Sequence, residues 1–195
     1  MKKIKTNLIL SSIIILTAVC LTSCTQMSES AMNESAGFNG GFEITENGLP
    51  VNWLVYTKKT AGSGDFDIIT DTTDFTEGKQ SLKFQVRSCA DKGDRFSPGI
   101  AHEMEAIAGE TYKVSFLLKN SGCKYYYKIK GVSLKSGADE PMLISSEKTE
   151  GWKLIANQYT IPAEMNRLRF ELNVISPGSF WIDDVKIEKV FQPKN

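Results

Sequence analysis

The chain has 195 residues, in which 23 lysines and arginines balance 23 aspartates and glutamates, and it contains a single histidine. Balanced charge excludes the strongly basic surface that dominates nucleic-acid binding, and a hydrophobic content of 41% excludes wholesale disorder. One histidine and four cysteines leave little material for a soft-metal or histidine-based active site. The length is sufficient for one domain with a buried core.

The first 23 residues have the organisation of a secretion signal. Lysines near the start precede an apolar stretch from Leu8 to Val19, which is too short to cross a bilayer as a helix. Leu21-Thr22-Ser23-Cys24 follows and resembles the lipobox of bacterial lipoproteins. The resemblance implies cleavage before Cys24 and lipid on that residue. The alternative interpretation is an ordinary signal peptide that contains a cysteine.

Residues 24–37 are expected to form the lipidated cysteine and a flexible tether, because this stretch is polar and lacks apolar periodicity. Several acyl chains on one residue give durable anchoring, so we expect the protein to lie on a membrane without crossing it. The lipoprotein resemblance links inner-membrane retention to an aspartate directly after the lipidated cysteine, and this position is Thr25 here. We therefore expect the outer membrane of the cell envelope, with the periplasmic or surface side left open.

Short segments with a period-two apolar pattern begin at Phe38. The clearest are residues 81–87, 112–119, 125–132, 155–161, 168–174 and 180–190. Turn signals such as Asn47-Gly48 and Ser176-Pro177-Gly178 separate them, and no long segment has a helical period. The pattern predicts an all-β domain over residues 38–192, built as a sandwich or a barrel, and we favour a sandwich of two antiparallel sheets.

An ordered series of short motifs runs through this domain: Asn39-Gly40-Gly41-Phe42-Glu43, Leu49-Pro50-Val51-Asn52-Trp53, Gly78-Lys79-Gln80-Ser81-Leu82, Ala108-Gly109-Glu110-Thr111-Tyr112, Gly151-Trp152 and Phe180-Trp181-Ile182-Asp183-Asp184. The series resembles carbohydrate-binding modules of the family 4, 9 and 22 type. That resemblance implies a galactose-binding-domain-like jelly roll, glycan binding, and core positions for Trp53 and Trp152.

The period-two pattern breaks between Ile182 and Val185, which predicts a β-bulge at Asp183-Asp184. Adjacent carboxylates between apolar strand residues need partners, and a hard cation with oxygen ligands would supply one. The resemblance implies a structural Ca²⁺ held by the side chains of Glu43 and Asp183 and by backbone carbonyls near Gly41 and Lys79. The alternative is that Asp183 pairs with a lysine or caps a turn.

Cys89 and Cys123 each follow a predicted strand. In an oxidising compartment, an even number of remaining cysteines predicts a disulfide between them. Two separate buried thiols are the alternative.

The sequence offers no catalytic motif. His102-Glu103-Met104-Glu105-Ala106 starts like a zinc-protease helix but lacks the second histidine. Glycoside hydrolysis needs two carboxylates, and Glu103 or Glu105 with Glu171 is a combination that any acidic chain allows. We therefore expect no enzymatic activity.

A polar row is predicted on the outer face of the strand at residues 168–174. If the apolar residues of this strand face the core, then Arg169, Glu171 and Asn173 face outward, and Tyr126 and Gln158 from two other strands join them. Aromatic rings bind the C–H faces of sugars, and polar side chains bind the hydroxyls. The alternatives are a solvated sheet face, or a loop-tip site using Phe66, Phe75 or Phe96. The bulge leaves the direction of Trp181 open.

Together these features predict a non-catalytic glycan-binding lipoprotein of the bacterial cell envelope. Its partners would be a poly- or oligosaccharide and a membrane reached only through lipid, and it would hold glycan for partner enzymes or transporters. The alternative is a structural or adhesive envelope lipoprotein that uses the sandwich for protein contacts.

Overall fold

The computed structural model describes residues 36–61, 64–89, 97–133 and 143–191. The predicted signal segment, Cys24, most of the tether and Phe96 lie outside these ranges. Within the described ranges, no helix has the length and apolar character needed to span a membrane.

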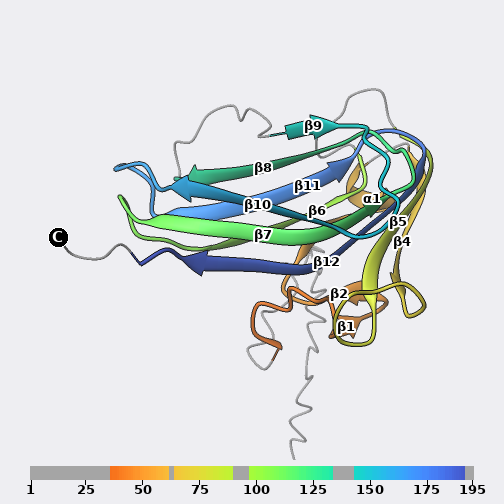
Figure 1. Ribbon diagram of the computed structural model, residues 1–195, viewed down its shortest axis with the longest axis horizontal. Coiled ribbons are helices and arrows are strands. Elements are labelled where there is room, and N and C mark those ends of the chain that lie inside the picture. The colour runs from red at the N-terminus through yellow and green to blue at the C-terminus, as the bar shows by residue number, and fades with distance from the viewer. Residues whose placement is uncertain (1–35, 62–63, 90–96, 134–142, 192–195) are drawn as a thin grey trace, which may run out of the picture.

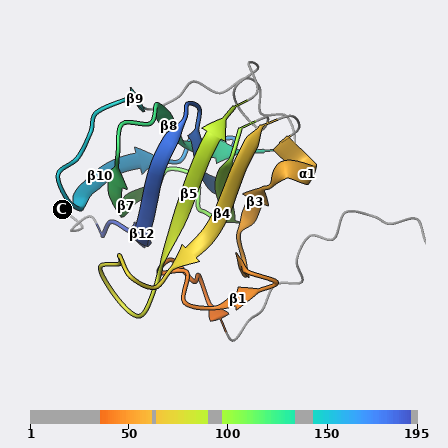
Figure 2. The same cartoon turned by 90° about the vertical axis from the view of Figure 1, so that its right-hand side faces the viewer.

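Two five-stranded antiparallel sheets form the molecule (Figure 1). The first, which we call the β12 sheet, has the order β10-β7-β12-β5-β4. Its strands are β4 (Asp65–Asp71), β5 (Ser81–Ser88), β7 (Thr111–Asn120), β10 (Lys153–Thr160) and β12 (Gly178–Lys189). Figure 2 shows β4, β5 and β12 side by side.

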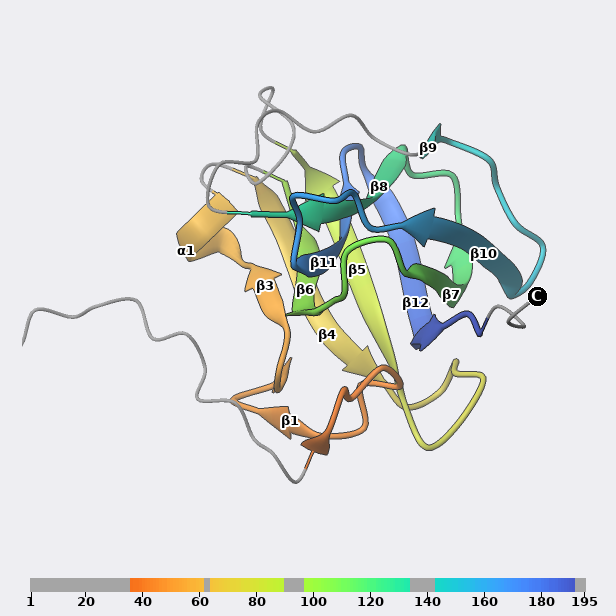
Figure 3. The same ribbon diagram turned by 90° about the vertical axis from the view of Figure 1, so that its left-hand side faces the viewer.

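The second sheet, which we call the β11 sheet, has the order β3-β6-β11-β8-β9. Its strands are β3 (Leu54–Tyr56), β6 (Gly99–Glu105), β8 (Tyr125–Val132), β9 (Leu143–Ser145) and β11 (Arg167–Val174). A hairpin of β1 (Thr45–Glu46) and β2 (Leu49–Pro50) lies at one end of the sandwich, and a single helical turn, α1 (Lys58–Ala61), follows β3 (Figure 3). The predicted β-sandwich is confirmed.

The core is filled by the inward faces of both sheets. Strand β7 alternates as expected, with Tyr112, Val114, Phe116 and Leu118 buried. From the facing sheet, Phe170 approaches Phe116 with ring centroids 5.2 Å apart. Burial of large apolar side chains from both layers is the main stabilising contribution to such a sandwich.

The first described segment lies against the last strand. The backbone N–H of Val185 in β12 donates to the carbonyl of Gly40 at 3.0 Å. A Cβ added at Gly40 would lie 1.9 Å from the Val185 carbonyl oxygen, so only glycine fits there. The register of β12 against β7 shifts between Asp183 and Lys186, which confirms the predicted bulge.

Candidate functional site

The outer face of the β11 sheet carries the predicted polar row. Its register sets three rows of outward residues across the sheet: Glu103–Arg169–Lys130, Ala101–Glu171–Lys128 and Gly99–Asn173–Tyr126. The alternate side chains of β11, which point the other way, are fully buried: Leu168, Phe170, Leu172 and Val174. The predicted directions of both strands are therefore correct.

Arg169 connects three other side chains on this face. Its guanidinium donates to Glu171 Oε2 at 3.0 Å, to Glu103 Oε1 at 2.8 Å and to the Tyr56 hydroxyl oxygen at 2.5 Å. We call Tyr56, Glu103, Arg169 and Glu171 the Arg169 network. Three partners on three different strands fix the planar guanidinium in one orientation.

Burial raises the pKa of Tyr56 to about 12, and the negative charge of Glu171 adds to the effect, although Arg169 opposes it. Tyr56 therefore keeps its proton at every physiological pH. Its oxygen accepts from Arg169, while its own O–H remains a donor. The network thus presents fixed donors and acceptors side by side, which is the chemistry needed to bind sugar hydroxyls.

Only part of this face is open. Tyr126 is 3% exposed, Lys128 and Glu171 are each 7% exposed, and Asn173 is fully buried. The prediction that Tyr126 forms an exposed stacking platform is therefore wrong, although the residue lies on the predicted face. The accessible part contains Arg169 and Glu103, whose side chains are 18% and 23% exposed.

The neighbouring Arg167 and Glu105 extend the open part toward the start of β11 and the end of β6. Their side chains are 44% and 83% exposed, and Arg167 Nη1 lies 3.1 Å from Glu103 Oε2. The predicted row runs along β11, but the open, charged part is shifted to its start.

Gln158 does not join this site. It lies on β10, an edge strand of the β12 sheet, and pairs with Lys113 of β7. Its side chain is exposed on the outside of that sheet. Its predicted outward direction is correct, but its predicted place beside Arg169 is wrong.

The two carboxylates of the predicted calcium site, Glu43 and Asp183, both lie near Gly41. A Cβ built on Gly41 would lie 3.7 Å from Glu43 Cγ and 4.0 Å from Asp183 Oδ1. Within the described ranges, no group of three or more acidic, histidine or cysteine side chains could hold a metal ion. A cation at this corner would therefore need backbone carbonyl or water ligands in addition to Glu43 and Asp183.

Both carboxylates already accept hydrogen bonds from the loop between β4 and β5. Asp183 Oδ2 accepts from the Thr76 amide at 2.8 Å and hydroxyl at 2.7 Å, and Oδ1 accepts from the Asp184 amide at 2.8 Å. Glu43 accepts from the amides of Lys79 and Gln80 at 3.0 and 3.2 Å. These contacts match the turn-capping alternative. Since a carboxylate oxygen can accept two bonds, Asp183 Oδ1 retains capacity for a cation.

The two described cysteines are free thiols. Cys123 is fully buried, and burial, with a smaller contribution from the charge of nearby Cys89, raises its pKa to about 11. Burial also raises the pKa of Cys89. The structure thus has the two-thiol alternative rather than the predicted disulfide.

The three tryptophans have different surroundings. Trp53 is 3% exposed and packs in the core, as the resemblance implies. Trp152 is only half-buried, outside the core cluster, so its implied core position is wrong. Trp181 has the opposite parity to the buried Phe180 and Ile182, which places it on the outer face of the β12 sheet.

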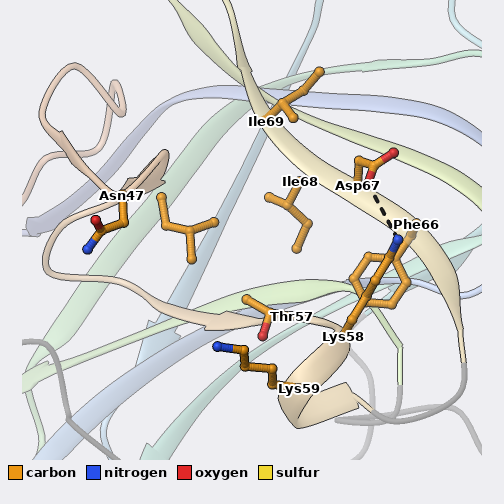
Figure 4. Close-up of a pocket in the computed structure, with 9 residues that line it drawn as sticks. Asn47, Thr57, Lys58, Lys59, Phe66, Asp67, Ile68 and Ile69 are labelled. Atoms are coloured by element: carbon orange, nitrogen blue, oxygen red, sulfur yellow. Dashed lines mark ion pairs between the residues drawn. The ribbon is translucent and has the colours of Figure 1, made fainter.

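A pocket of about 450 Å³ opens at the edge of the sandwich, where β3 and β4 end their respective sheets (Figure 4). Leu49, Phe66 and Ile68 supply its apolar lining, and Lys58 pairs with Asp67 at 3.5 Å. Its lining includes the loop-tip candidate Phe66 but none of the residues of the predicted polar row. Of the loop candidates, Phe66 is buried in β4 and Phe75 is 40% exposed.

Three solved structures show where this fold occurs. A xylan-binding CBM22 domain from Paenibacillus barcinonensis is 14% identical, with a TM-score of 0.52 over 79% of this chain and 94% of that one. A family 22 carbohydrate-binding module from Clostridium thermocellum is 16% identical, with a TM-score of 0.54 over 77% and 91%. A CBM4 structure is 15% identical, with a TM-score of 0.56 over 78% and 98%. The chain therefore has the jelly-roll sandwich fold of these modules.

No protein-family model and no curated protein sequence matches the chain. The likeness in structure thus extends to the fold, and any role for the chain has to be argued from its own side chains.

Proposed function

We propose that this protein is a non-catalytic, lipid-anchored glycan-binding protein of the bacterial cell envelope. The Arg169 network is the observation that carries the proposal. It presents fixed hydrogen-bond donors and acceptors on an outward sheet face, in a fold shared with xylan-binding modules. In this role the protein holds poly- or oligosaccharide for partner enzymes or transporters.

The exposed apolar side chains support glycan binding over a structural or adhesive role. Within the described ranges they lie on several separate elements, among them Leu54 at one edge of the β11 sheet, Leu143 and Ile144 at the other and Leu154 on β10. A protein-contact surface usually needs a contiguous apolar patch.

Affinity electrophoresis in gels that contain xylan, mixed-linkage glucan or other polysaccharides tests the proposal. We expect at least one polysaccharide to retard the wild-type chain. The substitution Glu103→Gln removes the negative charge of an acceptor with little change of shape. Arg169→Lys replaces the guanidinium, which donates to three partners, with a single ammonium group. Each should weaken binding about tenfold, which corresponds to one lost charge-assisted contact.

Gln158→Ala is the matched control, because Gln158 is exposed on the other sheet and should leave affinity within about twofold. Circular dichroism must show that all three variants remain folded. A panel in which no polysaccharide binds at about millimolar concentration would contradict the proposal.

We also propose that a structural Ca²⁺ binds between Glu43 and Asp183. The support is the convergence of both carboxylates on Gly41 at the point where the first segment meets β12. Such an ion would stabilise the join between the chain ends and would do no chemistry.

Isothermal titration of chelator-treated protein with CaCl₂ measures this ion directly. We expect heat of binding and a rise in melting temperature, and both should be lost in Asp183→Asn. Absence of heat, together with an unchanged melting temperature, would show that the turn-capping bonds alone satisfy the corner.

The lipid anchor rests on the first 24 residues. Metabolic labelling with a fatty-acid analogue should label the wild-type protein and should not label Cys24→Ser. Absence of label from the wild-type chain would leave the ordinary signal peptide as the correct interpretation.

A further inference from the structure

The outer face of the β12 sheet carries a second group of aromatic and polar side chains. Trp181 of β12 lies in register between Lys83 of β5 and Lys119 of β7. The Nζ atoms of these lysines lie 4.8 and 5.3 Å from the centroid of the indole ring. Trp152, just before β10, lies one position beyond the pair Lys153–Leu118.

Two aspartates bind these groups in the same way. The Trp181 indole N–H donates to Asp71 Oδ2 at 2.9 Å, and Lys83 Nζ lies 3.4 Å from the same oxygen. The Trp152 indole N–H donates to Asp74 Oδ1 at 3.0 Å, and Lys119 pairs with Asp74 Oδ2. We call these residues, Asp71, Asp74, Lys83, Lys119, Trp152 and Trp181, the indole patch.

The indole patch is accessible. Both indoles are half-buried, and the side chains of Lys83 and Lys119 are 22% and 31% exposed. Phe75, which follows Asp74 in the loop between β4 and β5, is 40% exposed. Figure 2 shows this loop at the lower end of β4 and β5.

Fixed orientation makes the patch a preformed surface. Each indole N–H is held by a carboxylate, so the rings do not lose freedom when a ligand binds, and such preorganisation lowers the cost of binding. Hydrogen bonds hold Asp71 ionised: although burial acts in the opposite direction, donation from Thr73 and Trp181 keeps its pKa well below the ordinary range.

The chemistry of the patch points to one class of ligand. Indole rings contact the C–H faces of pyranose sugars, and adjacent carboxylates and ammonium groups match pairs of hydroxyls as acceptors and donors. Two lysines balance two aspartates, so the patch has no excess charge with which to attract an ion. We infer that the indole patch is a second binding site, for uncharged pyranose residues of a glycan chain.

The indole patch lies on the opposite side of the sandwich from the Arg169 network, and its assignment rests on the proposed function only for the choice of ligand class. Different substitutions disable the two sites. Failure of the indole patch can therefore be distinguished from failure of the proposed function.

The test uses the mature full chain labelled with fluorotryptophan and observed by ¹⁹F NMR. The sequence has three tryptophans, so three resonances are expected, and the substitutions assign them. Xylohexaose and cellohexaose are the probes. We expect saturable shifts of the Trp152 and Trp181 resonances with at least one probe, while the Trp53 resonance stays fixed because that ring is 3% exposed.

Substitution then measures the contribution of the ring. Trp181→Ala should weaken binding at the patch about tenfold, read from the Trp152 resonance, and Trp181→Phe should recover part of that loss. Leu154→Ala, a 63% exposed side chain on the neighbouring β10, is the matched control and should change affinity less than twofold. Since the ligand is uncharged, raising NaCl from about 50 to about 500 mM should leave the affinity unchanged.

Each contrary result has a defined meaning. If a probe binds and Arg169→Lys abolishes binding, but the Trp152 and Trp181 resonances do not move, the indole patch is not a site and the proposed function stands. If hexagalacturonic acid binds the patch more tightly and loses affinity in salt, the assignment to uncharged sugars is wrong. If neither probe nor any polysaccharide binds, both proposals fail.

Discussion

His102 is a titratable side chain enclosed by aromatic rings. Its ring centroid lies 4.6 Å from that of Phe38 and 5.3 Å from that of Trp53, and its Nδ1 lies 2.9 Å from the Asn52 carbonyl oxygen. A carbonyl can only accept, so Nδ1 carries the proton. Burial lowers the pKa of His102, although the Asn52 carbonyl and the charge of Glu103 act in the opposite direction. A packing role accounts for these contacts.

The lowered pKa predicts a loss of stability in mild acid. Below the ordinary value of 6.5, the unfolded chain binds a proton that the folded chain does not yet bind, so the free energy of unfolding falls as the pH falls toward the lower folded pKa. Urea unfolding between about pH 7.5 and 5.5 avoids most carboxylate titration and measures this slope. His102→Gln should have a smaller slope than the wild type. Equal slopes in the two chains would mean that other groups cause the dependence.

At the scale of single strands, the bulge in β12 connects this strand to a distant loop. Asp184 adopts a φ of 49°, and the extra residue turns the Asp183 carboxylate toward the loop between β4 and β5. There it receives the Thr76 and Asp184 donors described above, and Lys186 pairs with the Asp184 carboxylate at 2.6 Å. One irregular position in a strand thus secures a loop that is more than 100 residues away in sequence.

Asp183→Ala should therefore lower the free energy of unfolding by about 2 kcal/mol, because it leaves the partly buried donors of Thr76 and Asp184 without their acceptor. Asp184→Asn is the matched control. It keeps a side chain that tolerates positive φ and removes only a partly exposed ion pair, so it should cost less than about 1 kcal/mol. Urea denaturation in excess chelator isolates this effect from any bound cation. Similar losses for both variants would show that the carboxylate does not secure the loop.

The strands also show what local pattern can predict. The segments with strong alternation, such as residues 168–174, are all strands, because burial of one face imposes period two. Strand β4 has no such signal: Asp65, Asp67 and Asp71 disfavour a strand, and they are accommodated because Arg87 and Lys83 of β5 pair with them. Those partners are fixed by the pairing of β4 with β5, which the sequence of β4 alone does not contain.

For the candidate site too, the sequence predicts what alternation within a strand determines and misses what distant segments determine. Parity within β11 and β8 correctly predicts that Arg169, Glu171, Asn173 and Tyr126 share a face. Parity does not say which sheet a strand joins, so Gln158 was assigned to the wrong side of the molecule. Burial of an outward residue such as Tyr126 also depends on distant segments, and so does the place of Tyr56 in the Arg169 network.

For the whole molecule, β12 is the strand that unites one layer. It lies between β7 and β5, and its inward residues Phe180, Ile182 and Val185 are buried in the core. Without it, the β12 sheet would be divided into two separate strand pairs, each with a new exposed edge. Completion of the fold therefore depends on the last strand of the chain.

A chain that ends at Pro177 should lack a cooperative unfolding transition, whereas one that ends at Val190 should retain the wild-type transition. The first loses all of β12 and its core side chains, and the second keeps the whole strand. Far-UV circular dichroism during urea titration distinguishes the two. A cooperative transition in the shorter chain would show that the remaining strands suffice.

The hydrogen bond between Gly40 and Val185 has a consequence for the connectivity that this fold can tolerate. Because the opening segment and the closing strand are neighbours in space, a short peptide linker could join the two ends of the domain. New ends could then be opened at the exposed turn around Gly151, where nothing lies within 4 Å of an added Cβ. A circularly permuted chain of this kind would begin and end at the β10 edge, so a linker attached there would present both outer faces in a new direction.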